Sequence, residues 1–292
     1  MKLGIIGGSG LYQLEGLENV NEISLNTPFG NPSDAYIHGT LSEVDIYFLP
    51  RHARGHRILP SEINHKANIW GFKKLGVNLV MSVSAVGSLR EGIRPRDIVL
   101  PDQYFDRTKG SLNHTFFGQG IVGHVSFGDP TCHQLQDLIA NVASEVVTDL
   151  QLNHIVRLHK GGTYVNMEGP AFSTRAESNS YRQMGFDVIG MTSLPEAKLC
   201  REAELCYLPM AMATDYDCWR TSEEEVSVDM IIQTLTANTA LAKEIIRRFA
   251  KALPQKHECA CQHALKNAIM TDMKTVPSAT LEALAPLLAK YR

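Results

Sequence analysis

Short apolar runs alternate along the chain with longer segments of helical periodicity. The apolar runs are bounded by glycine, proline or acidic residues, which is typical of buried β-strands. Strands are predicted at 3–7, 35–41, 44–49, 79–84, 98–101, 162–168, 188–191 and 208–213. Apolar residues at every third or fourth position predict helices at 60–75, 132–150, 176–184, 195–204 and 228–253. Strands and helices alternating through short connections favour one α/β domain with helices on both faces of a sheet.

A glycine turn follows the first predicted strand. Gly8, Ser9 and Gly10 resemble the start of a dinucleotide-binding fingerprint, but the third glycine would fall at residue 13, which is Gln13. A nicotinamide-dependent dehydrogenase is therefore a weak alternative. The turn remains a place where backbone N–H groups and the Ser9 hydroxyl can hold an anion. A glycine turn without a ligand is an equally good interpretation of this segment alone.

Basic and hydroxyl side chains follow several other predicted strands. The segment 51–57 carries five basic or imidazole side chains, beginning with Arg51 and His52, and guanidinium groups match phosphate oxygens. Hydroxyl groups follow the strands at 82–85 and 191–193. Each segment alone would be an ordinary loop. Because ligands bind outside the carboxyl ends of strands in α/β sheets, the set predicts a phosphate site assembled from distant segments.

Two carboxylates, Asp215 and Asp217, follow the apolar run 208–213. A strand there would bring both side chains out on the same side, since side chains alternate along a strand. No metal-ligand pattern accompanies them, so the pair suits a ligand that offers hydrogen-bond donors or a proton-accepting nitrogen. A purine with a 6-amino group offers both. Phe172 adds an aromatic face for stacking, although a lone aromatic residue is more often part of the core.

Composition narrows the function further. The 292 residues carry a net charge of −3, which gives no support for nucleic acid or an anionic membrane as a partner. No apolar run approaches the roughly 20 residues of a membrane span, and glycine appears too early for a signal peptide. We expect a soluble cytoplasmic protein with mostly reduced cysteines.

Cys259 and Cys261 form a Cys-x-Cys pair, which can hold a soft metal or form a strained disulfide. Two ordinary thiols are the simpler interpretation, and a non-catalytic thiol or metal module is the alternative.

Together these motifs resemble the trimeric purine nucleoside phosphorylase family, from residue 3 to about residue 250. The matching segments are 7–11, 51–52, 64–70, 85–89, 97–99, 102–108, 168–170 and 191–197. Within the family, the segment 214–219 resembles the branch that acts on 5′-methylthioadenosine. The resemblance implies one nucleoside phosphorylase domain over 1–292, in which the segment 255–292 matches the family least. The implied fold is a three-layer α/β/α domain with a central mixed β-sheet flanked by helices.

The resemblance also assigns site residues. The implied phosphate ligands are Ser9, Arg51, His52, Ser84, Ala85 (through its backbone) and Thr192. The implied nucleoside contacts are Phe172 and Ser173 beside the base, Met191 under the ribose, and Val226, Val228 and Ile232 around the 5′-methylthio group. Asp215 would face N7 of the purine and Asp217 the 6-amino group. A neighbouring subunit would close the 5′ slot, with 114–117 as the candidate donor.

The implied reaction is phosphorolysis, with inorganic phosphate as co-substrate and no metal or organic cofactor. The resemblance implies a homotrimer and leaves open whether trimers pair into hexamers. A 5′-methylthioinosine or broad purine nucleoside phosphorylase is the near alternative, because Gly190 before Met191 follows the 6-oxopurine branch of the family. Ser9 and Ala53 replace a threonine and a glycine that are frequent in the family.

Overall fold

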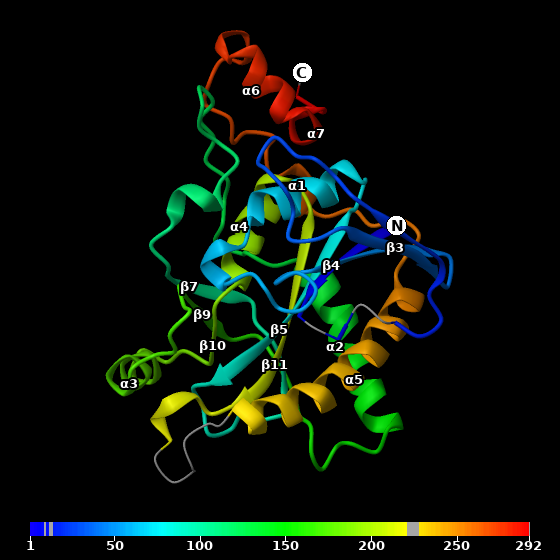
Figure 1. Ribbon diagram of the computed structural model, residues 1–292, viewed down its shortest axis with the longest axis vertical. Helices are drawn as coiled ribbons and strands as arrows, with labels where there is room; N and C mark the ends of the chain where they lie inside the picture. The colour runs from blue at the N-terminus through cyan, green and yellow to red at the C-terminus, as the bar shows by residue number, and fades with distance from the viewer. Residues whose placement is uncertain (9, 12–13, 221–227, 292) are drawn as a thin grey trace.

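A computed structural model of the chain describes residues 1–8, 10–11, 14–220 and 228–291; at 111–112 and 228–233 it describes the backbone only. Its centre is an eleven-stranded mixed sheet with helices on both faces, which confirms the predicted class (Figure 1). The strands are β1 (Lys2–Gly7), β2 (Glu18–Ile23), β3 (Tyr36–Leu41), β4 (Val44–Pro50), β5 (Leu79–Ser88), β6 (Ile98–Leu100), β7 (Gln103–Arg107), β8 (Leu158–Lys160), β9 (Thr163–Met167), β10 (Val188–Gly190) and β11 (Cys206–Asp215). The helices are α1 (His65–Lys74), α2 (His133–Asp149), α3 (Arg175–Gln183), α4 (Ser193–Glu202), α5 (Val228–Ala252), α6 (Ser278–Ala283) and α7 (Ala285–Leu288).

The sheet branches at β5. Its main path runs β2-β3-β4-β1-β5-β10-β9-β7, while β11 pairs with β5 and leads on to β6 and β8. Strands β4, β1, β5 and β11 are mutually parallel where they pair, so their carboxyl ends reach the same edge. The antiparallel β3 and β4 are joined by a two-residue turn. Both turn residues, Ser42 and Glu43, have positive φ, 50° and 66°, as tight hairpins with the right-handed strand twist require.

Two apolar cores cover the two faces of the sheet. On one face α2 and α5 pack together over buried residues of β1, β5 and β11. On the other face α1 and α4 pack together, and α7 joins them. The C-terminal segment reaches α1 through the Trp70 indole, which donates to the Ala283 carbonyl at 2.8 Å. Figure 1 shows α6 and α7 at the end of the molecule, beyond α1.

The structure departs from the sequence prediction at several places. The predicted helix 60–75 is divided, because Asn64 caps a new helix by accepting from the Ala67 amide at 3.1 Å. The predicted strand 79–84 continues to Ser88. Strands β2, β7 and β8 were not predicted, since their side chains are half-buried or exposed and carry no apolar pattern. Among the described helices, none combines the length and apolar character of a membrane span.

Candidate active site

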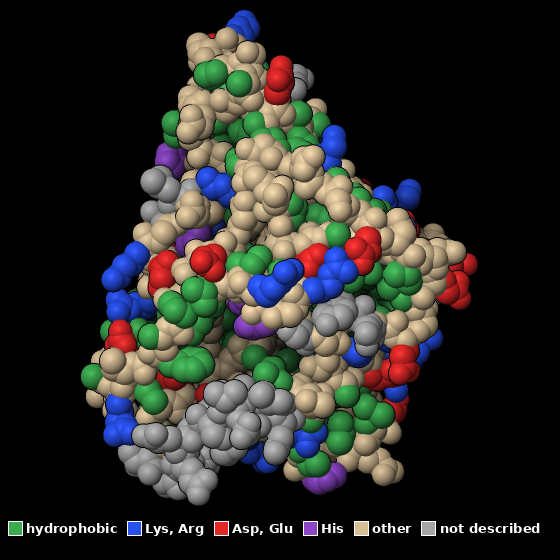
Figure 2. All heavy atoms as spheres, in the orientation of Figure 1, with side chains coloured by type: hydrophobic (Ala, Val, Ile, Leu, Met, Phe, Trp, Pro, Cys, Tyr) green, Lys and Arg blue, Asp and Glu red, His purple; other side chains and the backbone are tan. Residues whose placement is uncertain are grey.

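A cavity of about 360 Å³ lies at the edge where the parallel strands end. Gly8 follows β1, Arg51 follows β4, and Asp215 ends β11, and all three line this cavity. The face drawn in Figure 2 is hollowed near its centre, where hydrophobic and histidine side chains meet. The position agrees with the rule that α/β sheets bind ligands at the carboxyl ends of their strands.

The middle of β5 forms one wall of the cavity. On one edge β5 pairs with β1 only as far as Ser82, and pairing with β10 begins at Gly87. Within the described strands, residues 83–86 have no ladder partner on that edge, and all four line the cavity. Backbone groups of the predicted Ser84 and Ala85 are therefore positioned where a ligand can bind them.

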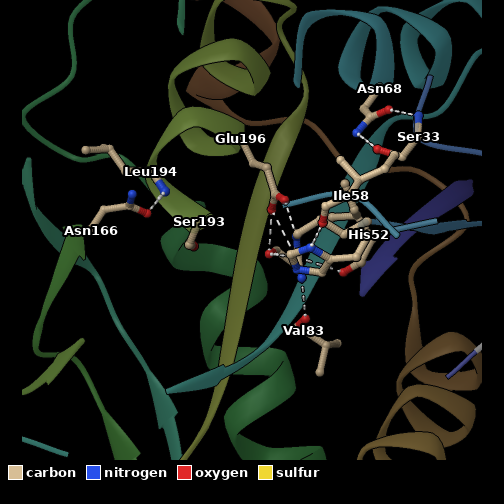
Figure 3. Close-up of polar contacts among 12 residues, drawn as sticks. Ser33, His52, Ile58, Asn68, Val83, Asn166, Ser193, Leu194 and Glu196 are labelled. Carbon is tan, nitrogen blue, oxygen red and sulfur yellow. Dashed lines mark hydrogen bonds and ion pairs between the residues drawn. The ribbon is translucent and has the colours of Figure 1, made fainter. Parts of the chain in front are cut away.

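Arg51 lies beneath the cavity in a buried ion pair. Its Nε donates to Glu196 of α4 at 2.5 Å, and the side chains of Arg51 and Glu196 are 2% and 0% exposed. Arg51 also donates to the Val83 carbonyl at 3.0 Å and to the Ser82 hydroxyl at 2.8 Å. Figure 3 shows Glu196 reaching from α4 toward this group. Glu196 therefore fixes the guanidinium and offsets its charge, so Arg51 is less available to an anion than the sequence implied.

Thr192 and the start of α4 supply further anion-binding groups. Thr192 is the N-cap of α4, is buried, and lines the cavity together with Ser84. The Leu194 amide is already bound to the Asn166 side chain at 3.0 Å (Figure 3). The positive end of the helix dipole at this terminus favours a bound anion. Of the predicted phosphate ligands, Ser9 lies outside the described residues.

His52 faces the cavity as a neutral imidazole. Burial and the neighbouring Arg51 lower the pKa of His52 to about 4. Its Nδ1 lies 2.8 Å from the Ile58 carbonyl, which requires the proton on that nitrogen. His52 also stacks on His56 with ring centroids 4.4 Å apart. The remaining nitrogen, Nε2, is thus a hydrogen-bond acceptor for a protonated phosphate or a sugar hydroxyl.

Asp215 and Asp217 also line the cavity and contact each other. The Asp217 amide donates to Asp215 Oδ1 at 2.8 Å, and the Thr214 hydroxyl donates to Oδ2 at 2.7 Å. Burial raises the pKa of Asp215, although these two hydrogen bonds act in the opposite direction. Strand alternation is not what aligns the pair: a register shift lies between Ala213 and Asp215, and Asp217 begins a 3-10 turn with φ 53°.

Asp217 is held from outside the cavity by α3. The Ser178 hydroxyl, which is fully buried, donates to Asp217 Oδ2 at 2.5 Å. Burial raises the pKa of Asp217, the Ser178 hydrogen bond acts to lower it, and the Asp215 carboxyl raises it further. Two neighbouring acids with raised pKa values in one cavity form a group that can donate as well as accept hydrogen bonds.

The residues implied for base and ribose divide into two groups. Phe172 is 74% exposed and lines the cavity, so it is not the core residue that a lone aromatic usually is. Met191 lines it too, and a Cβ on Gly169 would come within 2.5 Å of Met191 Sδ, so only glycine leaves Met191 its place. Ser173 is buried, with its hydroxyl 3.7 Å from Met167 Sδ, and is not among the lining residues.

Helix α5 closes the remaining side of the cavity. Leu235, Asn238, Thr239 and Ala242 line it. Asn238 donates to the Ala213 carbonyl at 3.1 Å, which ties α5 to the end of β11. Of the residues implied for the 5′ slot, Val226 lies outside the described residues, as do the side chains of Val228 and Ile232.

The candidate interface segment 114–117 lies apart from the lining residues of this cavity. Thr115 and the Phe116 amide bind the two oxygens of Glu202, on α4, at 2.7 and 2.6 Å. His114 and Thr115 border a second hollow of about 280 Å³ together with Glu202. That the segment 114–117 helps to close the 5′ slot of a neighbouring subunit stays a prediction.

The sequence pattern does not single out Glu196, Ser178 or Asn238. All three lie on helices, where a polar residue normally marks the solvated face. In the structure Glu196 is buried between Pro195 and Ala197, which are buried too. A carboxylate on an apolar helix face indicates a buried cationic partner, and Arg51 is that partner.

Comparisons with known proteins identify the family of this chain. Residues 2–251 match the family model of the phosphorylase superfamily. An S-methyl-5′-thioadenosine phosphorylase from Geobacter sulfurreducens is 52% identical over 290 residues, covering 99% of this chain and 98% of its own length. The corresponding enzyme of Thermosynechococcus vestitus is 53% identical over 291 residues, covering 99% of each chain.

The solved structures that resemble this chain are also methylthioadenosine phosphorylases. A methylthioadenosine phosphorylase from an antarctic soil metagenomic library superposes with a TM-score of 0.92 at 45% identity, covering 98% of both chains. The Schistosoma mansoni methylthioadenosine phosphorylase in complex with adenine gives a TM-score of 0.85 at 33% identity, covering 92% of this chain and 99% of its own. From the family model and these relatives, the chain belongs to the phosphorylase superfamily.

Proposed function

We propose that this chain catalyses the phosphorolysis of S-methyl-5′-thioadenosine to adenine and 5-methylthioribose 1-phosphate. The observation that carries the proposal is the cavity itself, which is lined both by the partly buried Asp215–Asp217 pair and by Thr192 and Ser84. The relatives that match nearly the whole chain at 52–53% identity act on this nucleoside. Family membership argues against the dehydrogenase alternative.

Phosphate would bind between β5 and the start of α4. Thr192, Ser84 and the Ala85 backbone would donate to its oxygens, and the α4 dipole would favour its charge. Arg51 would contribute mainly by its electrostatic field and its remaining N–H groups, because Glu196 and Ser82 already bind much of the guanidinium. The neutral His52 would accept a hydrogen bond at Nε2.

The purine would bind at the two aspartates. As the glycosidic bond stretches, the sugar gains positive charge and the purine gains electrons, and a proton at N7 neutralises the leaving base. Asp215, whose pKa is raised by burial, would donate there, while Asp217 would accept from the 6-amino group. The bound phosphate would then attack the cationic sugar carbon from the opposite face.

The sugar would lie between Met191 and helix α5. Leu235 and Leu11 give that end of the cavity an apolar lining, which suits a methylthio group better than a hydroxyl. We also propose that the protein is cytoplasmic, needs no metal or organic cofactor for this reaction, and assembles as a homotrimer in which another subunit closes the 5′ slot.

The experiment that tests the function measures release of free base from four nucleosides, with and without phosphate. Methylthioadenosine should react faster than adenosine, methylthioinosine and inosine, and only when phosphate is present. A 6-oxo group offers Asp217 an acceptor where the 6-amino group offers a donor, so the inosine compounds should be poor substrates. Release without phosphate would indicate a nucleosidase, and preference for the 6-oxopurines would refute the proposed base contacts.

A further inference from the structure

A second cluster of reactive side chains lies at the other end of the sheet. Among the described residues, the side-chain sulfur or nitrogen atoms of four residues all lie within 4.8 Å of one another. These residues are Cys132, Cys206, His257 and Cys259. They come from three segments distant in the sequence: the N-cap of α2, the first residue of β11, and the chain that follows α5. We propose that these three thiolates and the imidazole form a structural zinc site.

The ligand set and its spacing fit zinc. Structural zinc sites are tetrahedral and use three cysteines and one histidine as one of their common sets. Zn–S bonds near 2.3 Å and Zn–N bonds near 2.0–2.1 Å place tetrahedral ligands about 3.8 Å (S to S) and about 3.6 Å (S to N) apart. Cys132 Sγ lies 3.9 Å from Cys259 Sγ and 3.7 Å from His257 Nε2. Cys206 Sγ and Cys259 Sγ, at 3.2 Å, would separate by about half an ångström on binding.

The local backbone presents these ligands to one point. His257 and Cys259 are two residues apart and partly buried, while Glu258 between them is exposed. That alternation places both side chains on the inner side of the segment. The Cys132 amide donates to the Tyr207 carbonyl at 2.9 Å, which holds the start of α2 against the start of β11. Cys132 and Cys206 are thus held near each other by a backbone contact that does not involve the metal.

The surroundings favour a closed, structural site rather than a catalytic one. Cys132 and Cys206 are 2% and 1% exposed and belong to the apolar core under α2 and α5. Four protein ligands leave no open position for water or substrate. Cys206 and Asp215 are the two ends of the ten-residue β11, about 30 Å apart at the usual rise per residue. Zinc here would therefore not take part in the proposed reaction.

The consequence is a link between the C-terminal segment and the sheet. His257 and Cys259 begin the segment that leads to α6 and α7, which contacts α1 through Trp70 and Ala283. Zinc bound to this segment and to Cys132 and Cys206 would stabilise the folded chain, since a ligand that binds only the folded state raises its stability. Binding would also release the three thiol protons.

The first test measures metal in the protein purified under reducing conditions without chelator. We expect about one zinc per chain by elemental mass spectrometry, and loss of most of it in Cys259→Ala and His257→Ala. Cys200→Ala is the matched control, because Cys200 is a buried cysteine of α4 that is not one of the four ligands. Zinc retained in Cys259→Ala, or lost equally in Cys200→Ala, would overturn the assignment.

The second test uses only the unaltered chain and so does not depend on a variant that folds. The reduced protein is stripped with a chelator, then titrated with Zn²⁺ or Co²⁺. We expect a higher melting temperature with zinc and the visible absorption of tetrahedral, thiolate-bound cobalt. A reduced protein that binds neither ion would overturn the proposal, as would a Cys206–Cys259 disulfide whose reduction yields a chain unable to take up zinc.

Discussion

Replacing Glu196 by glutamine should destabilise the folded chain, because the buried charge of Arg51 would lose its negative partner. Both side chains are almost completely buried, and their contact is 2.5 Å. Removing one partner of a buried ion pair costs about 3–5 kcal/mol, because the other charge stays buried and unpaired. Glutamine keeps the volume of Glu196 and one acceptor oxygen, so we expect the lower end, about 3 kcal/mol.

The assay is thermal and urea unfolding of the parent and variant, each with and without phosphate. At about 2 °C per kcal/mol for a chain of this size, the melting temperature should fall by about 6 °C. Phosphate should raise the melting temperature of Glu196→Gln more than that of the parent, since Arg51 then carries an uncompensated positive charge beside the anion.

Glu202→Gln is the matched control for this experiment. Glu202 lies on the same helix and is also buried, but burial raises the pKa of Glu202 to about 7 and its oxygens bind Thr115 and the Phe116 amide rather than an arginine. Near pH 7 about half of this carboxyl is already neutral, so glutamine should cost under about 1 kcal/mol. Equal losses in the two variants, or a Glu196→Gln variant as stable as the parent, would refute the role given to Arg51 and Glu196.

Further outcomes follow from the same structure. Glu202 alone should lower the stability of the parent by about 3 kcal/mol between pH 4.5 and pH 7, because the folded state holds the Glu202 proton up to about pH 7 while the unfolded chain loses it near 4.5. Glu202→Gln should flatten that part of the profile in pH-dependent urea unfolding; an unchanged slope would exclude Glu202 as its cause. Ser178→Ala removes the hydroxyl that holds Asp217 and should reduce kcat/KM for methylthioadenosine about tenfold, with the KM for phosphate unchanged. If the loss appears only in the phosphate KM, Ser178 does not act through the base. Gly169→Ala should raise the nucleoside KM, because its Cβ would displace Met191; steady-state kinetics with an unchanged nucleoside KM would show that Met191 does not contact the sugar.

The sequence predicts those elements of the fold that have a local pattern of apolar residues. Predicted strands 3–7 and 44–49 differ from β1 and β4 by one residue at one end, because both are buried and apolar. The polar, exposed β2 has no such pattern, and its pairing depends on the neighbouring β3. Likewise the extension of β5 to Ser88 depends on its pairing with β10 and β11, which a local pattern does not encode.

The candidate site shows the same division. Arg51 and Asp215 are found from the sequence because each comes directly at a strand end. Glu196 and Asn238 are not found from the sequence, because only the packing of α4 and α5 on the sheet turns these two side chains inward. The proposed zinc ligands are a further case. Cys259 and Cys261 draw attention as neighbours, but the group that forms pairs Cys259 with His257 and with two cysteines more than fifty residues away in the chain.

The central claim is that Asp215 donates a proton or hydrogen bond to the departing purine. Its most direct test compares Asp215→Asn with the parent in methylthioadenosine phosphorolysis, measuring kcat/KM for the nucleoside and the KM for phosphate. We expect kcat/KM to fall by about 10²- to 10⁴-fold, the usual contribution of a positioned acid, while the KM for phosphate changes little. An Asp215→Asn enzyme that cleaves methylthioadenosine as fast as the parent would contradict the account.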